Sequence, residues 1–330
     1  MNSPRHVAAQ QALAHADWQA AARQLRRAAA DAAARGEAQR AAHCEQMAAS
    51  LYRAAGSLDD SLAAAARSAA RDSGSPRTRF AAEAERAETL FAAGEFAGAA
   101  RSWSAALKEA DTLGLPDVPR ATVLRRRALC LAQAGEAAAA WAVFDEAAVR
   151  MAGADIAHAS AWVDVEHAQA ACEAGDASHA GQVLARERVV RAAADDLHLR
   201  AQRHCVSAAC ALACGDAASA RTEALAAREA ALAAVAPLAY FAAAVSLARA
   251  ADTLGDRAEA YRSLASAWVT LADLLGPEVG RSWVEPVLAA FQWQWGAEAF
   301  AAVRAAHERA RRAQLDGGAA GCCPARDAGR

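Results

Sequence analysis

Small apolar residues recur at fixed distances from a turn signal along the whole chain. A Gly, usually followed by Asp or Glu, returns every 38 to 41 residues, and Ala16-Asp17 takes its place in the first interval. The glycines are Gly56, Gly94, Gly135, Gly175, Gly215, Gly255 and Gly296. Ala always stands seven residues before the turn, and Ala or once Ser stands five residues after it. Because small residues let antiparallel helices approach and Gly permits the turn between them, the pattern predicts eight helix-turn-helix units of about 40 residues.

The units divide the chain into a long array and a short tail. We expect the array to cover residues 1–315. Its helix pairs are predicted over about 5–35, 37–72, 77–113, 118–151, 155–194, 196–235, 238–275 and 279–314. Prolines that follow the turn by 20 to 22 residues end the second helices, as at Pro76 and Pro237. The Gly-rich segment 316–330 predicts a disordered tail.

Composition supports an all-α chain and argues against some classes of binding partner. Ala, Leu, Arg and Glu favour helix, and the enrichment in Val, Ile, Thr and Tyr that marks strands is missing. A net charge of -2 argues against nucleic acid as a partner. No apolar segment resembles a secretory signal or spans a bilayer, so we expect a cytoplasmic protein with reduced cysteines and no membrane contact.

The spacing of small residues and Gly within a unit resembles the tetratricopeptide repeat. Repeats of about 40 residues are longer than the usual 34 and are similar to those of kinesin light chains, maltose-regulator-type activators and bacterial peptide-pheromone receptors. Positions that are usually apolar in the first helix are polar here at Glu83, Arg86, Asp164 and His167. The resemblance implies an all-α, right-handed α-α superhelix, a solenoid of about eight repeats. Repeats of the HEAT type are the second choice, because the Gly-acid turn fits them less well.

The resemblance also implies that the first helices line a concave groove. Residues at the implied positions are the candidate partner-binding set: Gln46, Arg53, Glu85, Glu88, Arg125, Arg126, Trp162, Glu166 and Gln169. Arg249 and Asp252 occupy such positions in the seventh unit. Glu85, Arg126 and Glu166 share one offset and are expected to form a ladder. The ladder is either a solvated set of salt bridges or a charged floor for a peptide.

Other groups of chemically active residues give weak signals. His204, Cys205, Cys210 and Cys214 lie on one predicted helix, which does not supply four converging metal ligands. His158 and His167 are too far apart to share a helical face, and no acid or thiol completes a nucleophile arrangement. Five aromatic residues gather in the last unit, where Pro286 is expected to interrupt the first helix, and they either cap the stack or dock a partner. They are Trp283, Phe291, Trp293, Trp295 and Phe300.

The sequence therefore predicts a binding function rather than catalysis. The first hypothesis is a scaffold that binds another protein or peptide in the groove. The alternative is a ligand-responsive receptor that acts on a second protein. A thiol- or metal-dependent enzyme that uses the helix from Cys205 to Cys214 is a remote third choice, and the vicinal pair Cys322-Cys323 in the tail is a further candidate for redox or metal chemistry. No cofactor or metal is expected.

Overall fold

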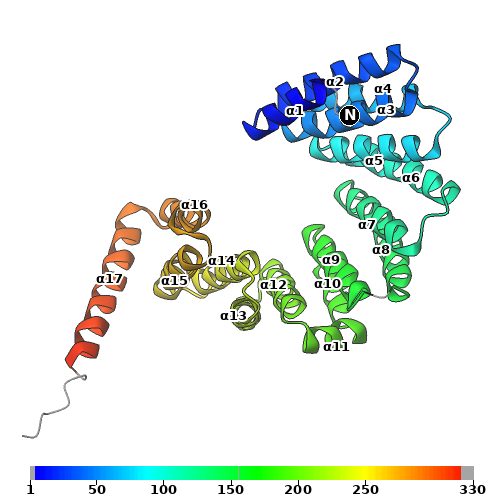
Figure 1. Ribbon diagram of the computed structural model, residues 1–330. Coiled ribbons are helices and arrows are strands. Elements are labelled where there is room, and N and C mark those ends of the chain that lie inside the picture. The colour runs from blue at the N-terminus through cyan, green and yellow to red at the C-terminus, as the bar shows by residue number, and fades with distance from the viewer. Residues whose placement is uncertain (1–3, 155, 321–330) are drawn as a thin grey trace, which may run out of the picture. The chain divides into compact units, whose positions relative to one another are not determined.

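The computed structural model describes residues 4–154 and 156–320, and all regular structure in those ranges is helical. The helices form two compact units, Met1–Ala174 and Gly175–Arg330. Within each unit, helices that are consecutive in the sequence pack against each other in antiparallel pairs, except the short helices α10 and α11, which both pack on α12 (Figure 1). The chain is an all-α solenoid of helical repeats.

The first unit holds four helix pairs and the first helix of a fifth. Its helices are α1 (Pro4–Ala14), α2 (Trp18–Ala34), α3 (Ala38–Ala54), α4 (Leu58–Arg71), α5 (Pro76–Ala92), α6 (Phe96–Thr112), α7 (Asp117–Gln133), α8 (Ala137–Ala152) and α9 (Ala159–Glu173). The first helices are the odd-numbered ones.

The second unit begins with a broken second helix. Its helices are α10 (Ala177–Leu184), α11 (Glu187–Asp195), α12 (Leu197–Ala213), α13 (Ala217–Ala233), α14 (Pro237–Thr253), α15 (Arg257–Leu275), α16 (Pro277–Trp295) and α17 (Ala297–Ala320). The first helices here are α12, α14 and α16.

The turn residues adopt the conformation that the repeat requires. Every Gly of the turn signal has a positive φ, between 76° and 84°, and Ala16 has φ 55° in the first repeat. The following residue caps the next helix where it is Asp: the Asp216 carboxylate accepts a hydrogen bond from the Ser219 backbone N–H at 3.0 Å. Glu95 makes no such side-chain bond, and neither does Glu136. The shorter Asp side chain therefore suits the cap geometry.

Small residues form the contacts within each pair. Ala49, Ala128 and Ala208, seven residues before their turns, are completely buried, as are Ala99 and Ala140 five residues after theirs. Larger side chains four residues further on are also buried, and they fill the space between helices. They are Leu25, Trp103, Phe144, Leu184 and Leu264.

The last repeat departs from this arrangement. Only Gly296 separates α16 from α17, whereas three residues form the other turns within repeats. The shortened turn changes the register, so Ala289 and Ala301 are exposed rather than buried. Pro286 does not interrupt α16 as predicted, because α16 continues through it to Trp295. The predicted tail is helical in α17 as far as Ala320, and Cys322-Cys323 lies outside the described residues.

The length and apolar character of the described helices determine whether any of them could cross a membrane. None of those in residues 4–154 and 156–320 has the length and apolar character that crossing a bilayer needs.

Val235 gives a test of the turn chemistry. This β-branched residue has φ 53° in the turn between α13 and α14, where Gly36 and Gly114 stand in other repeats. Its side chain is 65% exposed and contributes little burial. We expect Val235→Gly to raise the free energy of unfolding by about 1 kcal/mol, because Gly adopts this conformation without steric cost. Urea denaturation followed by circular dichroism measures the change.

The matched control is Val269→Gly, at a half-exposed position inside α15. It should lower stability by about 1 kcal/mol, since Gly weakens a helix interior. Equal loss of stability in both variants would contradict strain at Val235.

Candidate functional site

The predicted partner-binding residues lie on four first helices of the first unit, and we call this set the first-helix row. The row comprises Gln46, Arg53, Glu85, Glu88, Arg125, Arg126, Trp162, Glu166 and Gln169, from helices α3, α5, α7 and α9. Ion pairs join consecutive first helices along it. Each pair therefore links one repeat to the next.

The pair between α3 and α5 is the most buried. The Arg53 guanidinium Nε lies 2.7 Å from Glu85 Oε1, and Ser50 Oγ donates to Glu85 Oε2 at 2.7 Å. The Glu85 side chain is only 8% exposed. The hydrogen bond to Glu85 raises the pKa of Arg53, so the arginine stays charged.

The other two pairs are more open to solvent. Arg126 Nε lies 3.4 Å from Glu88 Oε1, and Arg125 Nη2 donates to Glu166 Oε1 at 3.1 Å. The hydrogen bond to Glu166 raises the pKa of Arg125. The Arg126 side chain is 52% exposed, which leaves part of its guanidinium open to solvent.

The ladder expected from equal offsets is not what the contacts form. Glu85 pairs with Arg53 of the preceding repeat, Arg126 with Glu88, and Glu166 with Arg125. An arginine side chain is long enough to reach a carboxylate at a different offset on the next helix. Equal offsets therefore predicted that α5 pairs with α7 and α7 with α9, but not the residues that form the pairs, and they missed the pair between α3 and α5.

The uncharged members of the row differ in how far their side chains are exposed to solvent. Gln169 is exposed, and its Nε2 donates to Glu173 Oε1 at 2.9 Å. Gln46 is partly buried between α3 and α5. Trp162 is 37% exposed, so part of its indole is free for contact with another molecule. An exposed Trp at the row's end is the residue type most often found at binding hot spots.

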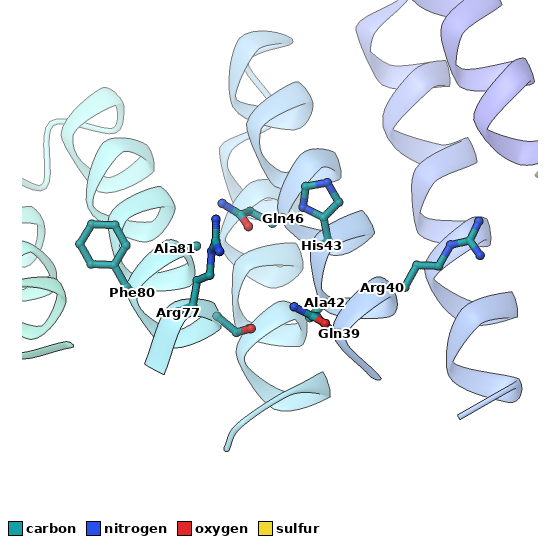
Figure 2. Close-up of a pocket in the computed structure, with 9 residues that line it drawn as sticks. Gln39, Arg40, Ala42, His43, Gln46, Arg77, Phe80 and Ala81 are labelled. Carbon is teal, nitrogen blue, oxygen red and sulfur yellow. The ribbon is translucent and has the colours of Figure 1, made fainter. Parts of the chain in front are cut away.

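A shallow pocket of about 700 Å³ lies between α3 and α5. Figure 2 shows Gln46 and Arg77 reaching into the space between these helices, with Arg40 and Phe80 pointing away to either side. Arg40 contacts Glu37 at 3.1 Å. Arg77 is the charged side chain that reaches into the pocket, and no carboxylate lines it, so the pocket favours a negatively charged group.

The second unit has a groove of its own on the first helices α12, α14 and α16. It measures about 770 Å³, and its lining combines small, apolar and polar side chains. The lining residues are Ala209, Leu212, Ala213, Ser246, Arg249, Asp252, Thr253, Pro286, Val287, Ala290, Phe291 and Gln294. The sequence pointed to Arg249 and Asp252 but missed the contribution of α16, because its changed register was not visible in the repeat pattern.

The cysteine helix has no activated thiol at Cys205. Burial raises the pKa of the Cys205 thiol to about 11, and its Sγ donates to the Ala239 carbonyl. Nearby, His204 Nδ1 lies 2.7 Å from Glu223 on α13. A thiol that stays protonated at neutral pH is a poor nucleophile and a poor metal ligand.

Most of the aromatic cluster of the last repeat closes the core. Phe291, Trp295 and Phe300 are buried, and Trp295 Nε1 donates to Asp252 at 2.7 Å. Trp283 lies against the Phe241 ring. Trp293 is different, because 88% of its surface is exposed. The cluster therefore contains both core residues and one large solvent-facing ring.

Glu85 and Glu88 provide a matched pair for testing the ion pairs. Glu85→Gln should destabilise the first unit by roughly 1–3 kcal/mol, because it removes a buried carboxylate that Arg53 and Ser50 both contact. Glu88→Gln should cost less than about 1 kcal/mol, since its pair is longer and more exposed. Denaturant unfolding of both variants measures this order, and equal losses would refute it.

Comparisons with known proteins agree with the geometry at the level of the fold. No family model matches the sequence, and no curated protein matches it either. A STAND ATPase with a tetratricopeptide repeat sensor from Pyrococcus horikoshii is similar in structure, with a TM-score of 0.54 and 14% identity. The similarity covers 81% of this chain but 46% of that one, so this chain spans less than half of that protein.

Two further structures are similar over most of their length. A tetratricopeptide repeat protein from Parabacteroides merdae has a TM-score of 0.54 at 13% identity, covering 86% of this chain and 97% of that one. The apo form of the quorum sensor NprR from B. thuringiensis has a TM-score of 0.53 at 14% identity, covering 90% and 83%. The helical repeats of this chain are therefore tetratricopeptide-like.

Proposed function

We propose that this chain is a scaffold that binds a peptide segment of a partner protein on the first-helix row. The observation that carries the proposal is the basic pocket between α3 and α5, which continues into the row through Gln46. Groups that bind a peptide are thus available on consecutive repeats.

The ion pairs determine which side chains of the row can contact a bound peptide. Arg53, Glu85, Arg125 and Glu166 satisfy one another, so they form a fixed polar floor. A floor of paired charges rejects an apolar ligand and accepts a polar peptide backbone without leaving a charge unpaired. Direct contacts then fall to Gln46, Trp162 and the exposed part of Arg126.

The pocket indicates the charge of the peptide. Arg77 is exposed and reaches into the space between the helices, and His43 adds a second basic group (Figure 2). Because no carboxylate lines this pocket, an acidic side chain or a terminal carboxylate is the best complement. The proposed ligand is an acidic peptide segment whose chain continues toward Trp162.

Arg77→Glu should weaken binding of acidic peptides at least tenfold, which is about 1.4 kcal/mol. Fluorescence anisotropy with a library of labelled peptides, sorted by charge, measures the affinities. Trp162→Ala should cause a loss of similar size without changing the preference for acidic sequences.

The matched control is Arg101→Glu, an exposed arginine on the second helix α6. It makes the same change in net charge away from the row. If both arginine variants lose affinity equally, the effect is general electrostatics and the site is wrong.

A second candidate function follows from the groove of the second unit. A groove of about 770 Å³ is large enough for a small ligand, and it combines apolar residues with Arg249 and Asp252. Two of the similar structures are described as sensors, which supports a ligand-responsive receptor that acts on another chain. Ala290→Trp should fill this groove and abolish a ligand-induced change in small-angle scattering. A ligand that binds the variant normally would refute this site.

A further inference from the structure

Three potential metal ligands, none of them a member of the first-helix row, converge where α8 packs against α9. They are Asp145 on α8 and the pair Asp164 and His167 on α9. One ligand atom from each lies within 4.8 Å of the others. We propose that these three side chains form a binding site for a divalent transition-metal ion of the Zn²⁺ type, and this proposal is independent of the proposed function.

The helices bring the ligands together in a regular way. Asp164 and His167 are three residues apart, so they lie on one face of α9. Asp145 comes from the antiparallel neighbour, as ligands do when facing helices build a metal site. The set therefore needs no loop to complete it.

The distances suit an ion shared between the side chains. His167 Nδ1 lies 3.6 Å from Asp145 Oδ1. Two ligands of a tetrahedral zinc ion are about 3.4 Å apart, given bond lengths near 2.1 Å. The three ligand atoms lie up to 4.8 Å apart, so the side chains must move slightly closer together to bind one ion. Asp145, whose side chain is half-exposed, would make this movement.

Burial and charge also favour a cation. Asp164 and His167 are completely buried, although polar groups of this kind are costly inside a protein core. Two carboxylates and a neutral imidazole balance the charge of a divalent ion. An imidazole ligand favours Zn²⁺ and similar transition-metal ions over Mg²⁺ or Ca²⁺, which prefer oxygen ligands alone.

The imidazole is held in place by aromatic rings. The His167 ring stacks on Phe144 with ring centroids 4.9 Å apart, and the Trp141 ring lies 5.2 Å away. A ligand fixed in this way loses little freedom when it binds an ion. The half-exposed carboxylate of Asp145 places one of the three ligands in contact with solvent. The ion would join α8 to α9.

The test uses the full chain, stripped with chelator, in a Cys214→Ser, Cys322→Ser, Cys323→Ser background. Isothermal titration with Zn²⁺ should give about one ion per chain. Asp145→Asn should weaken binding at least tenfold, and Glu146→Gln, the adjacent exposed carboxylate on α8, should leave it unchanged. Circular dichroism checks that each variant is folded, and Asp145 is exposed enough to be replaced without loss of the core.

Co²⁺ distinguishes this site from the remaining thiols. Binding at the Asp145 site should give visible d–d bands without the near-ultraviolet band of cobalt–thiolate bonds, and His167→Asn should remove them. Unchanged affinity in Asp145→Asn, a thiolate band, or no binding at all would overturn the proposal and leave the cluster as a buried polar contact.

Discussion

The close approach of antiparallel helices through alanine is the constraint on which the rest of the structure depends. Completely buried Ala residues stand at the crossing points of the regular repeats, and the turn glycines align the two helices for that contact. A larger side chain at a crossing point would separate the helices and leave cavities beside it. Helix spacing is therefore set by the smallest residues in the chain.

The same constraint limits how much each interface stabilises the array. A buried methyl group removes little apolar area from water, at about 25 cal/mol per Å². Polar contacts between helices supplement these thin interfaces. Arg67 pairs with the buried Glu45, Arg53 with Glu85, and Arg79 forms two hydrogen bonds with Glu109. Such pairs also fix the register between helices, which smooth alanine surfaces define poorly.

The sequence predicted the fold because its signals are local and repeated. The turn at Gly135 and the buried Ala128 and Ala140 follow from spacing alone. Register in the last repeat depends on the length of a single turn, so Ala289 and Ala301 matched the pattern without sharing its contacts. Pairing along the first-helix row depends on side-chain reach, and for that reason equal offsets did not predict that Glu85 pairs with Arg53. Asp145 and the pair Asp164 and His167 lie on two different helices, so no spacing within one helix reveals that they converge.

Two polar residues, Asp164 and His167, are buried at positions where this type of repeat usually has apolar residues. A repeat that needs only stability would place an apolar side chain where Asp164 and His167 are buried. A native sequence that breaks a local rule at two adjacent positions of one face indicates a site with a chemical purpose. The charges of the first-helix row differ, because they pair across repeats, from the buried Glu85 to the half-exposed Arg126. The buried polar pair on α9 is the basis for the proposed ion site, and the charges that pair across repeats are the basis for the proposed peptide site.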